Sequence, residues 1–477
     1  MAIIAAFAVP HPPLIIPAVG QGREQGIQNT IDAYEEVARR IAALAPDTVV
    51  ISSPHSIMYR DYLHISPGGS AHGSFAQFRA PQAAYQCTYD RAFVAALEAA
   101  CLAEQVPAGT MGEREPRLDH ATMIPLHFIQ QACDQANVPQ PMVVRMGLSG
   151  LSPAVHYHIG TLVQRVASVM HRRVVFVASG DLSHKLLAEG PYGYAPEGPE
   201  FDERVCHDFV TGDFLDLLCM DRGFAERAAE CGLRSFQIMA GALDRTEVDC
   251  ELLSHEGPFG VGYGIAAFTP TGEEGASEDR AFEERYEQWH ERDLLQRREA
   301  EDELVSLARL ALETYVLSGG IGVRIDDLPD GRTLSPELLS QRAGCFVSLK
   351  KDGELRGCIG TIAPTKETLA EEICANAVSA GRRDHRFSPV EADELSELVY
   401  DVDVLSAPEP VESEADLDPR RYGVIVSTSD GRRGLLLPDL DGVDSVDEQV
   451  SIAAQKGGID LVGDDYRLER FVVERHV

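Results

Sequence analysis

Three histidines occupy one kind of position in this sequence, just beyond the end of an apolar run. His11 follows AIIAAFAVP, His55 follows TVVISSP, and His184 follows VVFVASGDLS. Runs of this length that are rich in Val, Ile and Ala predict buried strands. In open parallel sheets, ligands bind beyond the carboxyl ends of the strands. Three imidazoles delivered to one edge of a sheet are therefore candidates for a shared site of metal binding or proton transfer.

His255 and Glu256 are further candidates, because they precede the glycine-rich segment GPFGVGYG and another apolar run. Two imidazoles and one carboxylate form a facial triad, which binds Fe(II) and leaves positions open for a substrate and dioxygen. A closed structural zinc site has four protein ligands instead. The same donors could also hold Zn²⁺ or Mn²⁺ and activate water. The prolines beside His11 and His55 restrict the backbone, so a ligand there loses less chain entropy when it is held in place.

Residues 1–270, which contain these candidate ligands, alternate between apolar and amphipathic segments. The alternation predicts an α/β fold, with a mostly parallel or mixed sheet that is flanked by helices on both faces. The expected strands are 2–9, 47–53, 141–147, 173–179 and 260–268, and the expected helices are 26–44, 90–105, 121–136, 153–171 and 200–219.

The remainder of the chain predicts a linker and a second domain. Residues 271–303 are dense in charge, which is typical of a solvated connector, and their later part predicts an exposed helix that continues into the amphipathic segment from 304. Residues 304–477 mix both kinds of element and favour an α+β domain. The helices expected there are 304–317, 366–380 and 446–456, and the strands are 343–350, 398–405, 422–427 and 433–437.

Composition excludes several classes of protein. The net charge of −34, from 42 basic and 76 acidic residues, argues against binding to nucleic acid or to anionic membrane surfaces. No apolar run approaches the ~20 residues that span a bilayer, and no secretory signal is evident, so we expect a cytoplasmic protein. The ten cysteines form no C-x-x-C pair, and each is expected to be a small buried hydrophobe.

The second domain carries its own candidates in the segment GELRGCIGTI. Arg356 and Cys358 lie in this segment, and Asp384 and Arg386 follow in GRRDHRFSPV. One interpretation is a small cleft in which guanidinium groups lower the pKa of a nucleophilic thiol. The alternative is a tight structural turn with Cys358 in the core, and binding of an anion by the arginines lies between the two.

The first domain resembles the class III extradiol dioxygenase superfamily, with the LigB-like fold that the Memo proteins share. The segments on which this resemblance rests are VPHPPLI, VVISSPHS, LDHATMIPLHFI, SGDLSHKL and SHEGPFGVGYG. The resemblance implies Fe(II) held by His11, His55 and Glu256, with His255 as the alternative ligand. It also implies His184 as the acid/base and His120 as a residue that orients the substrate or dioxygen. Ring cleavage of a catechol-like or aminophenol-like aromatic is the activity it implies.

The second domain resembles the AMMECR family over residues 304–477, with LRGCIGT as the specific motif and DHRF in place of the family's usual D-P-R-F or D-S-R-F. A fusion of the two domains resembles the A component of the AmmeMemoRadiSam system, which implies a separate radical SAM protein as a partner. This chain has no C-x₃-C-x₂-C motif of its own. The alternatives are a Zn- or Mn-dependent hydrolase on the same fold and a non-catalytic scaffold, and homodimer formation stays open.

Overall fold

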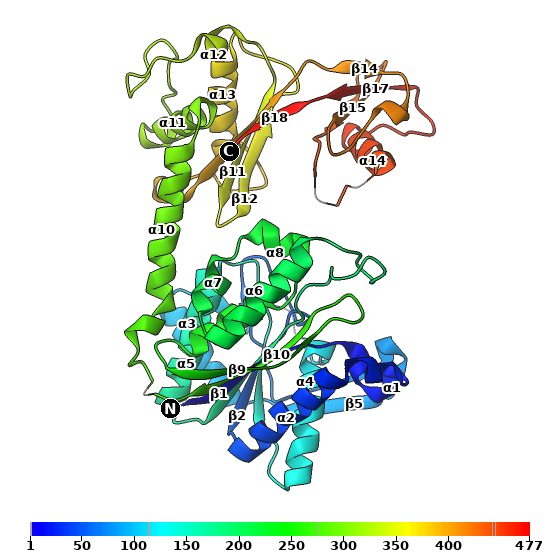
Figure 1. Ribbon diagram of the computed structural model, residues 1–477. Helices are drawn as coiled ribbons and strands as arrows, with labels where there is room; N and C mark the ends of the chain where they lie inside the picture. The colour runs from blue at the N-terminus through cyan, green and yellow to red at the C-terminus, as the bar shows by residue number, and fades with distance from the viewer. Residues whose placement is uncertain (1, 113–114, 273, 441, 444) are drawn as a thin grey trace. The chain divides into compact units, whose positions relative to one another are not determined.

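The computed structural model describes residues 2–112, 115–272, 274–440, 442–443 and 445–477. It divides into two compact units, Met1–Glu291 and Arg292–Val477 (Figure 1). The first unit is built on a six-stranded mixed sheet with helices on both faces, and the second combines antiparallel sheets with helices. The predicted fold classes, α/β for the first part and α+β for the second, are confirmed.

The sheet of the first unit has the order β7-β2-β8-β1-β10-β9. Strands β7, β2, β8 and β1 run parallel, β10 is antiparallel to β1, and β9 is antiparallel to β10. All five expected strands are present, and β9 is an addition that the sequence analysis missed. The strands are β1 (Ile3–Val9), β2 (Thr48–Ser52), β7 (Met142–Met146), β8 (Val174–Ser179), β9 (Val248–Glu256) and β10 (Tyr263–Pro270).

Strand register brings the candidate histidines to one edge of this sheet. Val9 of β1 lies opposite Ser179 of β8, and Ser52 of β2 lies opposite Ala178 of β8. Because these three strands are parallel, the segments that follow them leave the sheet at the same edge. His11, His55 and His184 lie in those segments, as the strand-end pattern predicts.

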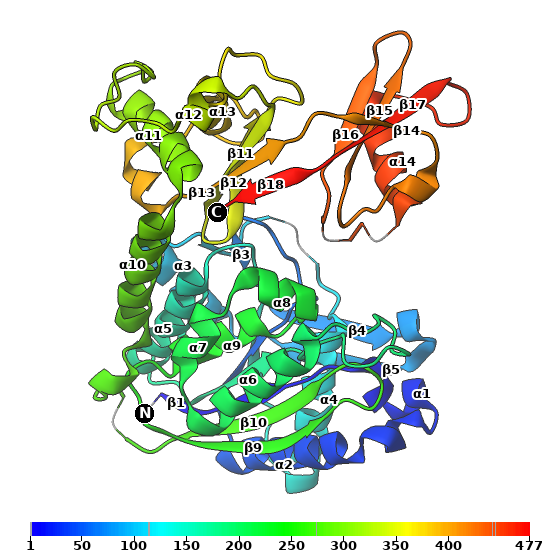
Figure 2. The same cartoon turned by 45° about the horizontal axis from the view of Figure 1, so that its top comes forward.

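Alternate residues of the central strands enter two separate cores, which explains why the apolar runs are nearly continuous. Ala6 and Phe176 pack in one core, whereas Phe7 and Val177 pack in the other. Helices α2 and α4 cover the second of these faces, and Figure 2 shows α6 lying along β9 and β10. The helices of this unit are α1 (Pro17–Gly20), α2 (Gln28–Leu44), α3 (Arg91–Ala103), α4 (His120–Ala136), α5 (Pro153–Val169), α6 (Glu197–Thr211), α7 (Phe214–Cys219), α8 (Arg222–Ala228) and α9 (Leu233–Ala242).

Two short sheets lie outside the main one. They pair β3 with β6 and β4 with β5. Their bounds are β3 (Leu63–His64), β4 (Ser70–Phe75), β5 (Ala80–Thr88) and β6 (Ala108–Gly109).

Helix α10 (Phe282–Ala300) is the exposed helix that the charged segment predicts. Its first part packs on the first unit, because Phe282 and Tyr286 are buried in a core of that unit and Trp289 packs against it. The expected continuation into the next helix is wrong. Asp302 accepts hydrogen bonds from the main-chain N–H groups of Leu304 and Val305, so it starts a separate helix, α11 (Glu303–Leu317).

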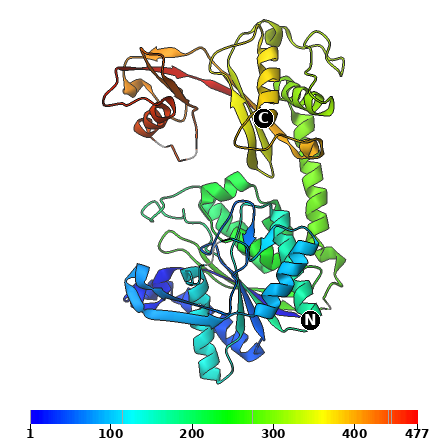
Figure 3. The same cartoon turned by 180° about the vertical axis from the view of Figure 1, so that it is seen from behind.

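The second unit contains two four-stranded sheets, with orders β12-β11-β13-β18 and β14-β17-β15-β16. Figure 3 shows α14 against the second sheet, which it contacts through β15 and β16. The expected elements are present, and α12, β12, β14, β17 and β18 are additions. The elements are α12 (Pro336–Ser340), α13 (Leu369–Arg382), α14 (Val446–Gly457), β11 (Cys345–Lys351), β12 (Glu354–Gly360), β13 (Val399–Leu405), β14 (Glu409–Val411), β15 (Gly423–Thr428), β16 (Arg433–Leu436), β17 (Tyr466–Phe471) and β18 (Val473–His476).

No helix in the described ranges is both long and apolar enough to cross a membrane.

The ion pairs of His158 should make the stability of the first unit depend on pH. Its two ring nitrogens lie 2.7 Å from carboxylate oxygens of Glu104 and Glu283, and the hydrogen bond to Glu283 is the main cause that raises the pKa of His158 to about 9. A raised folded-state pKa stabilises the fold fully below the unfolded value of about 6.5 and no longer does so above pH 9.

We therefore expect the free energy of unfolding of the native chain to fall between pH 6.5 and 9 by about 1–2 kcal/mol more than that of a His158→Gln variant. Urea unfolding at several pH values measures this difference. His207→Gln removes an exposed histidine from α6 and serves as the control. Parallel pH profiles of the native chain and the His158→Gln variant would contradict the prediction.

Candidate metal centre

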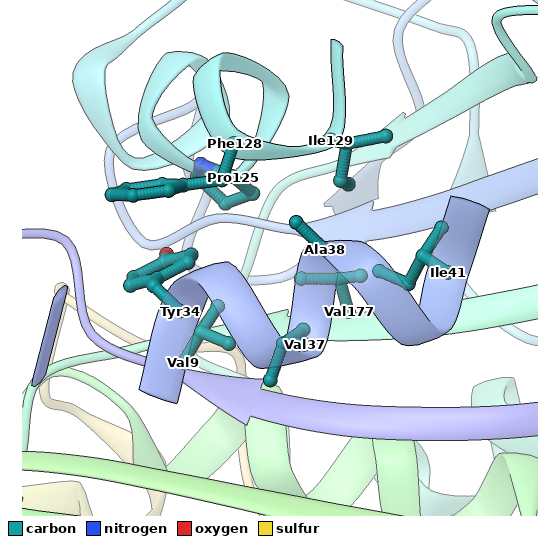
Figure 4. Close-up of a pocket in the computed structure, with 9 residues that line it drawn as sticks. All are labelled: Val9, Tyr34, Val37, Ala38, Ile41, Pro125, Phe128, Ile129 and Val177. Atoms are coloured by element: carbon teal, nitrogen blue, oxygen red, sulfur yellow. The ribbon is translucent and has the colours of Figure 1, made fainter. Parts of the chain in front are cut away.

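His11 lies almost fully buried, 1% exposed, just beyond the end of β1. Its main-chain N–H donates to Asp181 Oδ1 at 2.7 Å, and the hydroxyl of Tyr34 in α2 donates to the carbonyl of Pro10 at 2.7 Å. Tyr34 itself stacks on Phe128 of α4, with ring centroids 4.3 Å apart, in the apolar contact that Figure 4 shows. The segment around His11 is therefore held both by the sheet edge and by the helix layer below it.

Hydrogen bonding assigns the tautomer of His11. The Ser179 hydroxyl donates to the carbonyl of Ala121 at 2.8 Å, and a hydroxyl has one proton to donate. The same Oγ lies 3.2 Å from His11 Nδ1, so there it accepts, and Nδ1 carries the proton. In a neutral imidazole this leaves Nε2 with a free lone pair. Nε2 is the atom that faces the other histidines.

His55 and His120 complete a cluster of three imidazoles with His11. The Nε2 atoms of His55 and His11 are 3.1 Å apart, and the ring of His120 stacks on that of His55 with centroids 4.3 Å apart. Asp119 caps α4 by accepting from the Thr122 N–H, and it also accepts from the Ser53 hydroxyl at 2.6 Å. The start of α4, which carries His120, is thereby tied to the end of β2, which carries His55.

His184 approaches the same cluster from the end of β8. Its Nε2 is 3.9 Å from Asp181 Oδ2, and the same carboxylate oxygen is 3.8 Å from His11 Nε2. Tyr192 stacks on the outer side of the His184 ring with centroids 5.0 Å apart, and it is 59% exposed. The structure thus brings together His11, His55 and His184, as the strand-end pattern predicts, with His120, which only the family resemblance implied.

Cys231 also belongs to this cluster, and the sequence analysis missed it. Its Sγ lies 3.6 Å from His11 Nε2, and it accepts a hydrogen bond from the Asp181 N–H at 3.3 Å. Cys231 lies in the loop between α8 and α9, where no strand-end pattern marks it. The loop approaches β8 because Gly180 faces Gly232: a Cβ on Gly180 would lie 2.1 Å from the Gly232 Cα. The expectation that every cysteine is only a small buried hydrophobe does not describe this residue.

Glu256 and His255 are bonded to other partners. The Glu256 carboxylate accepts from the N–H and the hydroxyl of Thr30, at 2.7 and 2.6 Å, in the first turn of α2. His255 Nε2 lies 2.8 Å from Asp202 Oδ2 of α6, and this hydrogen bond is the main cause that raises the pKa of His255 to about 10. Among the described residues, neither belongs to a group that could hold a metal ion. The ligand role expected for Glu256 stays a prediction that these contacts do not favour.

Burial sets the protonation of the cluster. It is the main cause that lowers the pKa of His11, of His184 and of His120, the last to about 3, and neighbouring imidazoles lower these values further. Burial also raises the pKa of Asp181 to about 6 and raises that of the Cys231 thiol well above its usual value. Neutral imidazoles with free lone pairs are the form that binds metal ions.

The donor set fits a metal ion. The ligand atoms of His11, His55 and Cys231 lie within 4.8 Å of one another, and two imidazoles with one thiolate suit iron, zinc and copper better than manganese. Three protein ligands leave positions open for a substrate.

Three of the four candidates of the second unit, Cys358, Asp384 and Arg386, share one hydrogen-bonded network, whereas Arg356 bonds elsewhere. Cys358 lies in β12, an edge strand, and its N–H donates to Asp384 at 2.9 Å. Arg386 donates to Asp384 and, at 3.1 Å, to the carbonyl of Cys358. Arg356 makes a two-fold ion pair with Glu394. Asp384 and Arg386 therefore occupy the free edge of β12 as a neighbouring strand would, which favours a structural role for this motif. The expected tight turn with Cys358 in the core is wrong, because Glu354–Gly360 form a strand and Cys358 is only partly buried.

Asp384→Ala is expected to destabilise the second unit by about 2 kcal/mol, because the partly buried N–H of Cys358 loses its acceptor and the Arg386 guanidinium loses its carboxylate partner. Denaturant unfolding of the full chain measures the loss. Asp326→Ala removes a carboxylate from a fully exposed pair with Arg324 and should leave the unfolding midpoint unchanged. Equal midpoints for the two variants would show that Asp384 does not hold the edge strand.

Two family models match the two units of this chain. Residues 5–266 match the family model described as catalytic LigB subunit of aromatic ring-opening dioxygenase, and residues 305–476 match the model AMMECR1. The Clostridium acetobutylicum protein CA_C1420 is 37% identical over 100% of this chain and 99% of its own length. A Thermotoga maritima protein is 50% identical over 36% of this chain and 95% of its own length. The crystal structure of the uncharacterized protein PH0010 from Pyrococcus horikoshii is 30% identical, covers 36% of this chain and 88% of that one, and has a TM-score of 0.32.

Proposed function

The chain belongs to the family of the catalytic LigB subunit of aromatic ring-opening dioxygenase through residues 5–266 and to the AMMECR1 family through residues 305–476, and from this premise we propose that its first unit is a metal-dependent oxidoreductase. We propose a small catechol-like or aminophenol-like aromatic as its substrate. The observation that carries the proposal is the convergence of His11 Nε2 and His55 Nε2, 3.1 Å apart, with Cys231 Sγ 3.6 Å from the first.

His11, His55 and Cys231 are the residues that would hold the metal ion, and Fe(II) is the ion we propose. When bound, the iron supplies open positions for the two substrate oxygens and for dioxygen, and a path for electrons between them. The chain supplies the rest. Ser179 holds the ring of His11 with its lone pair inward, and Asp181 holds the main chain of His11. Both contacts fix one ligand before any ion arrives, which lowers the entropy cost of binding.

His184 is the residue that we assign to proton transfer. Burial lowers its pKa, so at neutral pH the ring is neutral and can accept a substrate hydroxyl proton. Its Nε2 lies 3.9 Å from Asp181 Oδ2, and a carboxylate at that distance stabilises the imidazolium that forms. His120 stays neutral across the same pH range, because burial and the adjacent imidazoles lower its pKa to about 3. It can therefore orient a bound oxygen through a hydrogen bond without taking a charge.

Oxygen uptake tests the proposal. The full chain is reconstituted with Fe(II) without oxygen and then given air-saturated buffer with a panel of catechols and aminophenols. We expect oxygen consumption together with the absorbance of a ring-opened product, and a loss of about 10²–10⁴-fold in rate for His184→Gln. His207→Gln, on the exposed side of α6, should react as the native chain does. Iron binding without oxygen uptake for any member of the panel would contradict the proposed reaction.

A zinc-dependent hydrolase is the second candidate, and Cys231 is the observation that favours it, because Zn²⁺ is commonly bound by Cys and His together. Such an enzyme would bind Zn²⁺ in preference to Fe(II) and would react without dioxygen. Metal analysis of protein purified without added metal separates the two candidates.

The radical SAM protein implied by the domain fusion stays a proposed partner. Capture of a radical SAM protein by the full chain supports it, and failure of the two purified proteins to associate contradicts it. Association that survives His11→Ala would favour a scaffold role alongside any chemistry.

A further inference from the structure

Two groups of metal-ligating side chains overlap in the first unit. One contains His11, His55 and Cys231, and the other contains Asp181, His184 and Cys231. Within each group, the ligand atoms lie within 4.8 Å of one another. Cys231 is common to both, so its sulfur lies between a pair of imidazoles on one side and an imidazole and a carboxylate on the other.

Asp181 links the two groups in the same way as Cys231. Its Oδ2 is 3.8 Å from His11 Nε2 and 3.9 Å from His184 Nε2. Ligand atoms on one tetrahedral ion with bonds of 2.0–2.3 Å are about 3.3–3.8 Å apart, so each of these separations is close to that between two ligands of one ion. The five side chains together offer more ligands than one four-coordinate ion can take while keeping a position open for a substrate.

We propose that this centre binds two metal ions bridged by the thiolate of Cys231, the first also held by His11 and His55 and the second also held by Asp181 and His184. The assignment of the first ion rests on the function proposed above, and the second ion is new. Divided in this way, each ion has three protein ligands and open positions. A bridging thiolate places the ions at about the 3.5–4 Å separation of known two-metal sites.

The charges of the chain support a second cation here. When a metal ion displaces its proton, Cys231 becomes a thiolate, which supplies a negative charge to both groups, and the Asp181 carboxylate supplies a second charge. The three imidazoles that complete the two groups, those of His11, His55 and His184, bind a cation through a lone pair on a ring nitrogen. One divalent ion would still leave the Asp181–His184 pair free to ligate a second.

Occupation of the second position has a consequence for the proposed reaction. The second ion would take the Nε2 lone pair of His184, the residue to which we assign proton transfer. A chain with one ion therefore keeps its proton acceptor, whereas a chain with two ions does not. The second position would act as an inhibitory site that responds to the supply of metal.

Titration with Co²⁺ alone tests the inference on the metal-free full chain under anaerobic conditions. We expect two ions per chain by equilibrium dialysis, with a thiolate-to-cobalt absorption band that appears with the first ion. The second ion should attenuate the electron paramagnetic resonance signal of the first, because the two share one sulfur. Cys206→Ser replaces a partly buried cysteine of α6 outside the two groups and should keep both ions.

Variants distinguish the two positions. His184→Gln should bind one ion and keep the thiolate band, and Asp181→Asn should do the same. His55→Gln should also bind one ion with the band, whereas Cys231→Ser should lose the band altogether. Circular dichroism and the thermal midpoint check that each variant is folded. If Asp181→Asn does not fold, the number of ions bound by His184→Gln alone tests the second position.

The outcomes separate this inference from the proposed function. One ion per native chain, lost in His11→Ala and unaffected by His184→Gln, would overturn the second site while leaving the first. Two ions in both the native chain and the His184→Gln variant would place the second ion elsewhere and overturn the inference. No bound ion in the native chain would overturn both.

Discussion

Replacing His11 by alanine is expected to weaken metal binding by the full chain at least about 100-fold. His11 is the most buried of the proposed ligands, and its Nε2 is near both other ligands, at 3.1 Å from His55 Nε2 and 3.6 Å from Cys231 Sγ. Removing it leaves only His55 and Cys231 as ligands of this group. Loss of one ligand from a three-ligand set costs several kcal/mol, because water replaces it poorly in a buried site.

Competition against a chromophoric chelator measures this affinity for Zn²⁺ or Co²⁺. His156→Ala is the matched control, since His156 is fully buried in the same unit and its Nε2 is bonded to Ser149 at 3.2 Å, away from the cluster. The control loses comparable packing and should keep its metal affinity. Equal affinities for the native chain and His11→Ala would show that the metal, if any, binds at another place.

Ser179→Ala is expected to lower metal affinity by about 10–100-fold and to change the tautomer of His11 in the metal-free chain. Ser179 accepts from His11 Nδ1 because its own proton is donated to Ala121. Without this acceptor, the proton can move to Nε2, where it blocks the lone pair that a metal needs. Residues that orient a metal-ligating histidine through its second nitrogen have effects of this size.

The control for this prediction lies one strand away. Ser52 ends β2 as Ser179 ends β8, both are fully buried, and Ser52 Oγ has no hydrogen-bond partner among the described residues. Nitrogen NMR of the histidine rings reports the tautomer directly, without metal. We expect the Nδ1–H form in the native chain and in Ser52→Ala, and a mixture in Ser179→Ala. A native His11 with its proton on Nε2 would contradict the assignment.

The sequence predicts the histidines of this site better than its other members. Each of His11, His55 and His184 follows an apolar run, and runs that form parallel strands end at one edge of a sheet. That rule needs no knowledge of packing. His120 starts a helix after an Asp that caps it, so its place in the site was expected only from the family resemblance.

Cys231 could not be found by the same reasoning. It follows a short helix, α8, and it reaches the site because Gly180 and Gly232 let two backbones approach closely. Such contacts depend on tertiary structure, and neither glycine is distinctive in the sequence. The opposite case is Glu256, which was a candidate because it precedes a glycine-rich segment and an apolar run, but its carboxylate bonds to the first turn of α2. The position of a residue in the sequence indicates which edge of the sheet its side chain reaches. The hydrogen bonds that it makes there decide whether it is available to bind a metal ion.

The edge strand β12 illustrates a similar limit in the second unit. The segment LRGCIG has glycines that interrupt the apolar pattern, so the sequence favours a turn over a strand. In the structure, Gly357 packs against the carbonyl of Ala380, where a Cβ would lie only 2.4 Å away, and the strand pairs with β11 on one side. Gly357 therefore serves the close packing of α13 on β12.

A crystal structure of the Zn²⁺-loaded chain, with anomalous scattering to locate the ion, tests the central claim most directly. The account predicts a peak about 2.0–2.3 Å from His11 Nε2, His55 Nε2 and Cys231 Sγ, with at least one further position open. A peak bound by Glu256 or His255 in place of Cys231, or no peak at this edge of the sheet, would contradict it.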